Sequence, residues 1–236
     1  MARSFGREEL IARLRAVSPT IVPSLLLCDF ANLQQEIERL EAAGVAALHF
    51  DVMDGHFVPN LTYGMTIVEA ARRVTDLPFD VHLMIENPEE FIADFRAAGA
   101  NIMTIHAEAV VDPRPVLEEI RSLGALAGLA INPPTPLADV EACLSYCDLI
   151  LTMSVMPGFG GQEFDDAALA KLRELRGRDD VAALLEIDGG INAATVGKSA
   201  EAGAELLVAG SAIFRSDDYT AALRQMQDSA IAGAGA

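Results

Sequence analysis

The sequence predicts a (β/α)8 barrel, in which a ring of eight parallel strands is surrounded by helices. Short apolar runs alternate with amphipathic, helix-like stretches along the 236-residue chain, and this alternation is typical of parallel βαβ units. Eight apolar runs are present, which is the number of strands in this barrel. Polar residues or glycines follow the runs, as expected if the carboxyl ends of the strands share one functional face. A doubly wound open sheet is the alternative.

The predicted elements follow one another in a regular order. The predicted strands are 20–25, 46–51, 79–83, 101–105, 126–131, 149–153, 183–187 and 206–209. Helix-like stretches between them include 32–43, 88–97, 113–122, 167–176 and 193–202. Several of these stretches end at a glycine, which readily adopts the left-handed conformation found at helix ends. These residues are Gly44, Gly99, Gly124 and Gly203.

The chain is predicted to hold one barrel domain, residues 19–230, behind a short N-terminal extension, residues 1–18. The extension has a helical pattern and is expected to lie outside the barrel. No internal linker or low-complexity segment interrupts the barrel region, although the small residues "AIAGAGA" at the end of the chain predict a frayed terminus.

Charge and composition exclude several classes of partner. The formal net charge is −18, which disfavours binding to nucleic acid or to an anionic membrane. No stretch of about 20 residues is apolar enough to span a bilayer, and the charged N-terminus lacks the apolar core of a secretion signal. The 3 cysteines match neither a disulfide framework nor a zinc signature. We therefore expect a cytoplasmic protein, and we also expect a homo-oligomer.

Four residues at predicted strand ends form a candidate metal site. His49 and Asp51 end the second run, and because they are two positions apart their side chains share one face of the strand. His82 ends the third run, and Asp188 follows the seventh, across the barrel. Two imidazoles and two carboxylates suit a single divalent ion such as Zn²⁺, Fe²⁺, Mn²⁺ or Co²⁺. The alternative is that each histidine is a hydrogen-bonded rim residue and each aspartate caps a helix.

The remaining residues at this face indicate an apolar lining and a phosphate site. Methionines lie at or just beyond three strand ends, at Met53, Met84 and Met153. They are either gap-filling core residues or the lining around the reacting carbon. Glycine-rich segments follow the last three strands, and glycine lets backbone N–H groups approach an anion closely. The segments contain Gly158, Gly160, Gly161, Gly189, Gly190, Gly210 and Ser211. Because backbone amides can hold a phosphate, the low number of basic residues is no obstacle.

The positions of the lysines argue against two other chemistries of this barrel. Lys171 and Lys198 are the only lysines of the sequence, and both lie in helix-like stretches. A Schiff-base aldolase needs a lysine on a strand that faces the mouth. Lysine-dependent decarboxylation on a phosphate-binding barrel is disfavoured for the same reason.

Successive segments of the chain resemble the ribulose-phosphate 3-epimerase family. The segments are "VPSLLLCDF", "LHFDVMDGHFVPN", "DVHLMIENP", "TIHAEA", "INPPTPL", "MSVMPGFGGQEF", "EIDGGIN" and "VAGSAIF", in order over roughly residues 20–215. Departures from the family pattern are Leu27-Cys28, Met156, the "DPR" at 112–114 and the N-terminal extension. They leave the proposed catalytic set intact and bear on fine substrate preference.

The resemblance implies a metal held by His49, Asp51, His82 and Asp188, with Asp51 and Asp188 as an acid/base pair. It also implies that Ser24 contacts the substrate. The residues expected to bind substrate are Ser24, Met53, His82, Met84, Met153, Gly158, Gly160, Gly161, Gly189, Gly190, Gly210 and Ser211.

The implied activity is epimerisation at C3 of D-ribulose 5-phosphate through an enediolate, with one aspartate on each face of the intermediate. The alternatives are an epimerase of another ketose phosphate, such as allulose 6-phosphate, a metal-free isomerase or aldolase on the same barrel, and a non-catalytic sugar-phosphate-binding barrel. Under all of these the expected partner is a small sugar phosphate.

Overall fold

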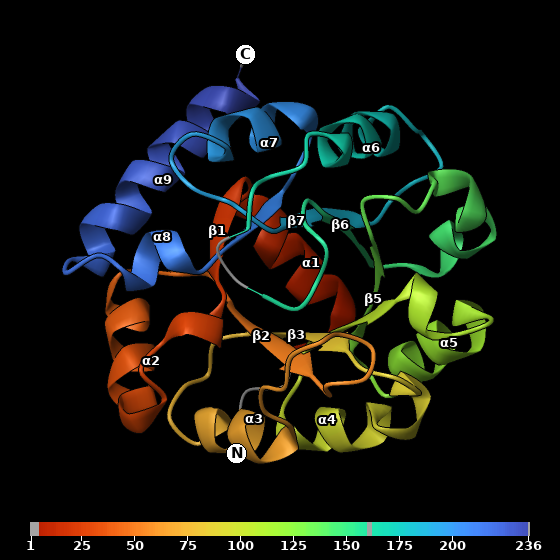
Figure 1. Ribbon diagram of the computed structural model, residues 1–236, viewed down its shortest axis with the longest axis horizontal. Coiled ribbons are helices and arrows are strands. Elements are labelled where there is room, and N and C mark those ends of the chain that lie inside the picture. Colours follow the sequence, from red (N-terminus) through yellow and green to blue (C-terminus); the bar gives the residue numbers. More distant parts are fainter. Residues whose placement is uncertain (1–4, 160–161, 236) are drawn as a thin grey trace.

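The computed structural model describes residues 5–159 and 162–235 and shows a closed barrel (Figure 1). All neighbouring strands are parallel, in the order β1-β8-β7-β6-β5-β4-β3-β2. A parallel bridge between Ser24 and His49 joins β1 to β2 and completes the ring. The strands are β1 Thr20–Pro23, β2 Leu48–Met53, β3 Phe79–Met84, β4 Ile102–His106, β5 Leu126–Ile131, β6 Leu149–Met153, β7 Leu184–Asp188 and β8 Leu206–Ala209. The predicted (β/α)8 barrel is therefore confirmed, and the open sheet is excluded.

Helices cover the outside of the ring (Figure 1). They are α2 Leu33–Ala42, α3 Met65–Arg72, α4 Ile92–Ala98, α5 Pro113–Ser122, α6 Ala167–Arg176, α7 Val196–Ala202, α8 Ser211–Phe214 and α9 Tyr219–Ala234, whereas α1 Arg7–Ala16 lies at one end of the barrel. The four glycines expected at helix ends, Gly44, Gly99, Gly124 and Gly203, all have positive φ. This is the conformation that favours glycine at a helix C-terminus.

The strands are buried on both faces because helices pack outside the ring and side chains fill its interior. All residues of β5 are buried, for example, which is why its sequence reads as an uninterrupted apolar run. Gly128 on β5 faces Thr104 on β4, where an added Cβ would lie 2.1 Å from Thr104 Oγ1. A glycine is required at this point because the neighbouring side chain occupies the space.

The N-terminal helix α1 closes the amino end of the barrel. Leu10 and Leu14 of α1 are buried in one apolar cluster with interior residues of several strands, including Leu126 and Leu184. Figure 1 shows α1 behind the ring of strands. Arg7 Nη2 lies 2.7 Å from Oδ1 of Asp148, the residue before β6, and this ion pair anchors the helix. The N-terminal segment thus shares a core with the barrel and leaves the opposite, carboxyl end open.

Among the described residues, no helix is long and apolar enough to cross a membrane.

Candidate active site

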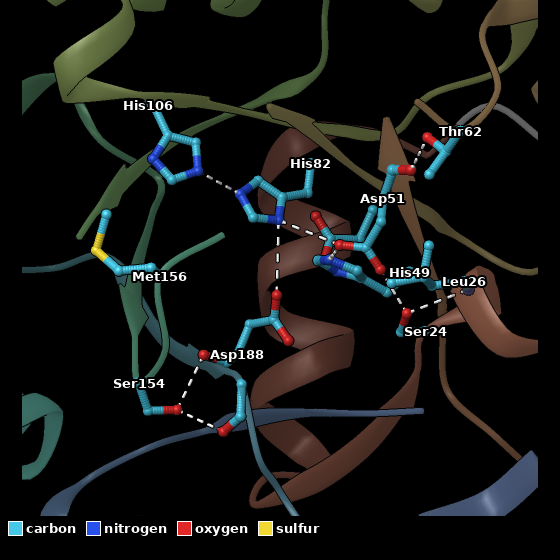
Figure 2. Close-up of polar contacts among 12 residues, drawn as sticks. Ser24, Leu26, His49, Asp51, Thr62, His82, His106, Ser154, Met156 and Asp188 are labelled. Atoms are coloured by element: carbon cyan, nitrogen blue, oxygen red, sulfur yellow. Dashed lines mark hydrogen bonds and ion pairs between the residues drawn. The ribbon is translucent and has the colours of Figure 1, made fainter. Parts of the chain in front are cut away.

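The four residues of the predicted metal site come together at the carboxyl end of the barrel. One ligand atom from each of them lies within 4.8 Å of the others. Asp51 Oδ1 lies 3.4 Å from His49 Nε2 and 3.5 Å from His82 Nδ1. Asp188 Oδ2 lies 3.7 Å from the same His82 nitrogen. Figure 2 shows Asp51 and Asp188 approaching this nitrogen from different sides, because β2 and β7 lie on different parts of the ring.

The ring of His49 is oriented by a buried carboxylate. His49 Nδ1 lies 2.6 Å from Asp80 Oδ2, and both side chains are buried. Donation of the Nδ1 proton to Asp80 leaves Nε2 as the atom that faces the cluster, where a cation would replace the second proton of the ring. A carboxylate on the far nitrogen is the usual way to orient a metal-binding histidine. Burial disfavours the charged ring, but the charges of Asp80 and Asp51 outweigh it and raise the pKa of His49 well above its usual value.

His82 is oriented by a second histidine. His82 Nε2 lies 2.8 Å from His106 Nε2, and the two rings are stacked with centroids 4.9 Å apart. Burial is the main reason that the pKa of His82 is lowered and that of His106 falls to about 4. The lowered pKa values favour the neutral form of both rings.

The two aspartates differ in their electrostatic environment. Burial opposes ionisation of Asp51, but the close His49 and His82 rings outweigh it and hold the pKa of Asp51 well below its usual range. Ser24 Oγ also donates to Asp51 Oδ2. Burial and the charge of Asp51 raise the pKa of Asp188 to about 7. The site thus holds two carboxyl groups of unequal basicity, one on each side of His82 Nδ1.

The residues present fit a divalent cation. His49 Nε2 and His82 Nδ1 are buried and have no hydrogen-bond partner within the described chain. Buried polar atoms without partners are costly, and both of these nitrogens point at the carboxylates of Asp51 and Asp188. Two imidazole nitrogens and two carboxylate oxygens form a donor set suited to Zn²⁺ and neighbouring first-row ions. A cation at this point would satisfy both nitrogens and balance the negative charge.

A cavity opens above this cluster. Most residues expected at the substrate lie in its wall: Ser24, Met53, Met84, Met153, Gly158, Gly189, Gly190, Gly210 and Ser211. Gly160 and Gly161 were also expected there, but they lie outside the described residues. His82 does not reach the wall, since its side chain is fully buried below it.

The cavity has one apolar side and one side made of backbone. Met53 and Met84 belong to a small apolar cluster with Val58. Opposite them, Gly190 has φ +60°, and a Cβ there would meet Gln162 O at 3.1 Å and Phe164 N at 3.2 Å. The close approach of two loops therefore requires a glycine at this position. An arrangement of this kind excludes water from one end of a ligand and offers backbone N–H groups to an anion at the other.

Both lysines lie away from the cavity wall. Lys171 Nζ on α6 donates to the carbonyl oxygens of Asn132 and Pro133. Lys198 on α7 forms an ion pair with Asp166. Neither is on a strand, so this barrel does not carry the strand-end amine that Schiff-base chemistry needs.

Residues that orient the site were missed from the sequence. Asp80 lies two positions before His82 and shares its face of β3. The two-residue period of the strand could therefore have identified Asp80 as a neighbour of the site. Glu108 lies beside His106 Nδ1, at a distance of 3.2 Å. The buried Glu186, on β7 below Asp188, forms with Asp80 and His49 a second group of possible ligands. Burial raises the pKa of Glu186 well above its usual value, with the charge of Asp80 adding to the effect.

Comparisons with known proteins identify the family of the chain. Residues 20–214 match the model of the Ribulose-phosphate 3 epimerase family. A ribulose-phosphate 3-epimerase of Bacillus subtilis is 46% identical over 215 residues, which cover 89% of this chain and 98% of the relative. One from Mycobacterium bovis is 47% identical over 212 residues, which cover 89% and 92%.

Solved structures show the same architecture at low sequence identity. The tryptophan synthase of Mycobacterium tuberculosis matches with a TM-score of 0.68 and 15% identity, over 98% of this chain and 99% of the other. A likeness at this identity concerns the barrel fold alone. The matched family model and the two epimerase relatives show that the chain belongs to the ribulose-phosphate 3 epimerase family of isomerases.

Proposed function

We propose that the chain interconverts D-ribulose 5-phosphate and D-xylulose 5-phosphate by acid/base chemistry between two aspartates, with one divalent cation bound. The observation that carries this proposal is the placement of Asp51 and Asp188. They come from different sides of the barrel and lie 3.5 and 3.7 Å from the same atom, His82 Nδ1. Both also line the cavity. Inversion by a two-base route needs such a pair of groups, one on each face of the reacting carbon.

The chemistry of the substrate explains why two carboxyl groups are needed. Carbon 3 of a 2-ketose carries a proton next to the carbonyl carbon, and its removal gives a planar enediolate. If one carboxylate takes the proton from one face and the other carboxyl group delivers a proton to the opposite face, the configuration inverts. Asp51 and Asp188 exchange these roles when the reaction runs in the other direction.

The residues around the aspartates hold the reacting carbon in place. Ser24 fixes Asp51 through its hydroxyl, and Asp80 fixes the ring of His49. His49, His82 and the two aspartates would hold the cation, which when bound stabilises negative charge on the substrate oxygens. The methionine side of the cavity excludes water from the enediolate, which protects it from side reactions.

We further propose that backbone groups, and not a basic side chain, hold the phosphate. Gly210 permits a clean test because the nearest atoms to a Cβ there would be those of Ser24, at 3.6 Å or more. Gly210→Val should fold normally but narrow the phosphate end of the cavity. Loss of hydrogen bonds to a charged group costs about 1.5–3 kcal/mol. Affinity for the sugar phosphate, measured by calorimetry, should therefore fall ~10- to 100-fold.

The exposed Arg215 provides the control for this variant. Arg215→Ala should change phosphate affinity by no more than the roughly 0.5 kcal/mol of an ordinary surface substitution. Abolished binding in Arg215→Ala, together with intact binding in Gly210→Val, would show that a side chain holds the phosphate.

A turnover assay with two substrates tests the proposed activity. The cavity fixes the distance between the aspartates and the glycine loops. In allulose 6-phosphate one more carbon separates C3 from the phosphate, so C3 would be displaced from the acid/base pair. We expect kcat/KM for ribulose 5-phosphate to be at least ~10-fold higher. A preference for the hexulose, or sugar-phosphate binding without turnover, would contradict the proposal. The cytoplasmic location and the homo-oligomeric state stay predictions.

A further inference from the structure

A chain of contacts leads from the candidate metal site to a carboxylate outside the barrel interior. His82 on β3 contacts His106 at the end of β4 through the two Nε2 atoms, 2.8 Å apart. His106 Nδ1 lies 3.2 Å from Glu108 Oε2, in the short helical turn Ala107–Ala109. Both imidazoles are fully buried, and Figure 2 shows His82 between His106 on one side and the two aspartates on the other.

Only one arrangement of protons along this chain suits a cation. His82 Nδ1 faces Asp51 and Asp188 and must keep its lone pair to act as a ligand. The proton of the neutral ring is then on Nε2 and is donated to His106 Nε2. His106 accepts it, carries its own proton on Nδ1 and donates that proton to Glu108.

The opposite arrangement of the ring protons would prevent a cation from binding to His82. If His106 Nε2 carried the proton, it would donate to His82 Nε2, and His82 Nδ1 would be protonated and could not accept a cation. In that case the lone pair of His106 Nδ1 would face an oxygen of Glu108 and repel it. The carboxylate of Glu108 therefore decides the direction of both hydrogen bonds.

Glu108 is held as a carboxylate by donors from the next loop. Its Oε1 accepts from Asn132 N at 2.8 Å and from Thr135 Oγ1 at 2.5 Å. Burial opposes ionisation, but the hydrogen bonds from His106, Thr135 and Asn132 outweigh it and lower the pKa of Glu108 to about 2. Lys171 Nζ lies 2.6 Å from the Asn132 carbonyl oxygen and ties the same loop to α6. With both oxygens used as acceptors, Glu108 offers His106 an acceptor and no proton.

We propose that Glu108 is a positioning residue, which acts through His106 to fix the proton of His82 on Nε2 and thereby to raise the affinity of the site for a divalent cation. This inference rests on the proposed function, because it takes His82 as a ligand.

The wild-type protein loaded with Zn²⁺ allows a direct test by NMR. The chain has 4 histidines, so the ring resonances of a sample labelled with ¹⁵N in histidine are few enough to assign. We expect the Nε2–H tautomer for His82 and the Nδ1–H tautomer for His106. The reverse tautomer of either ring would overturn the proposal, and this experiment needs no variant that must fold.

Glu108→Gln is the sharpest variant because it preserves size. The glutamine side chain has one acceptor oxygen and one NH₂ group, which can only donate. It therefore cannot replace both carboxylate oxygens, of which one accepts from His106 and the other from Asn132 and Thr135. If the NH₂ group faces His106, the proton arrangement reverses. We expect the affinity for Zn²⁺, measured by competition with a chromophoric chelator, to fall ~10- to 100-fold, the usual effect of removing such an outer partner.

Two controls separate this effect from loss of structure. Glu141→Gln makes the same chemical change at an exposed carboxylate paired with Arg178, and it should leave Zn²⁺ affinity unchanged. Thr135→Val disturbs the same loop but keeps the Glu108 carboxylate, so it should lower affinity much less than Glu108→Gln. If Glu108→Gln matches Glu141→Gln, or if Thr135→Val is as damaging, the proposal is wrong.

These outcomes are distinguishable from failure of the proposed function. If the wild-type protein bound no Zn²⁺, the cation-dependent mechanism would fail and this inference would fail with it. If the wild type bound Zn²⁺ and turned over substrate but the tautomers or the variant affinities were not as expected, only the role of Glu108 would be lost.

Discussion

Replacing Asp188 by asparagine is expected to slow epimerisation at least ~10²-fold, which is the lower range for a general acid/base group. The variant should nevertheless let one epimer, and only one, exchange its C3 proton with deuterium from the solvent. Asp51 remains as a base on its own face of the substrate, so it can remove and return the proton of the epimer that presents C3–H to that face. NMR on both epimers in deuterated buffer measures the exchange.

The reciprocal variant makes this prediction sharper. Asp51→Asn should reverse which epimer exchanges, because Asp188 then remains alone on the other face. The conservative change keeps an oxygen next to His82 Nδ1, and the metal content of each variant must be measured before assay, since both residues are candidate ligands. Asp180→Asn, at an exposed carboxylate paired with Arg178, is the matched control and should behave as the wild type. Equal exchange of both epimers by either metal-loaded variant would show that a single base serves both faces.

Removal of the divalent cation is expected to reduce turnover by at least ~10²-fold, because stabilisation of charge by a bound metal contributes several kcal/mol to such a reaction. The buried, unpartnered nitrogens of His49 and His82 are the structural reason for this expectation. Dialysis against a chelator, followed by metal analysis and an epimerisation assay, measures the effect. Addition of Zn²⁺, Fe²⁺, Mn²⁺ or Co²⁺ should restore activity.

The choice of ion and the thermal stability provide the controls. Mg²⁺ should restore activity poorly, because it prefers oxygen ligands in octahedral geometry and two ligands here are imidazoles. The ions that restore activity should also raise the melting temperature, since a ligand that binds only the folded state stabilises it. Full turnover by protein verified to be metal-free would contradict the cation-dependent mechanism.

The predicted ends of three strands, 126–131, 149–153 and 206–209, are confirmed, and the ends of the other five differ from the prediction by one or two residues. Predicted strand 46–51 is found as Leu48–Met53, because Met53 N is bonded to Thr62 Oγ1 and the chain stays extended beyond the apolar run. Predicted strand 20–25 ends at Pro23, because Ser24 begins a short helical turn. Ends of this kind depend on contacts with neighbouring loops, and those contacts have no signature in the local pattern.

The sequence by itself determined the barrel and the place of the candidate site. The alternation of apolar runs and helices, together with the two-residue period of a strand, places His49, Asp51 and His82 at carboxyl ends, and ring closure brings Asp188 to them. These properties depend on local spacing and on the general geometry of parallel strands, so they can be read along the chain.

Only the tertiary structure decided which residues orient the site and where the N-terminal helix lies. The register of β2 and β3 pairs Asp80 with His49. The register of β3 and β4 pairs His82 with Thr104, two residues before His106 on the same face of β4, and a shift of one residue would turn these side chains to the other face. Helix α1 closes the amino end of the barrel because its buried leucines match the apolar ends of the strands. Such pairings are chosen by packing between segments far apart in the sequence, and no local pattern of residues specifies them.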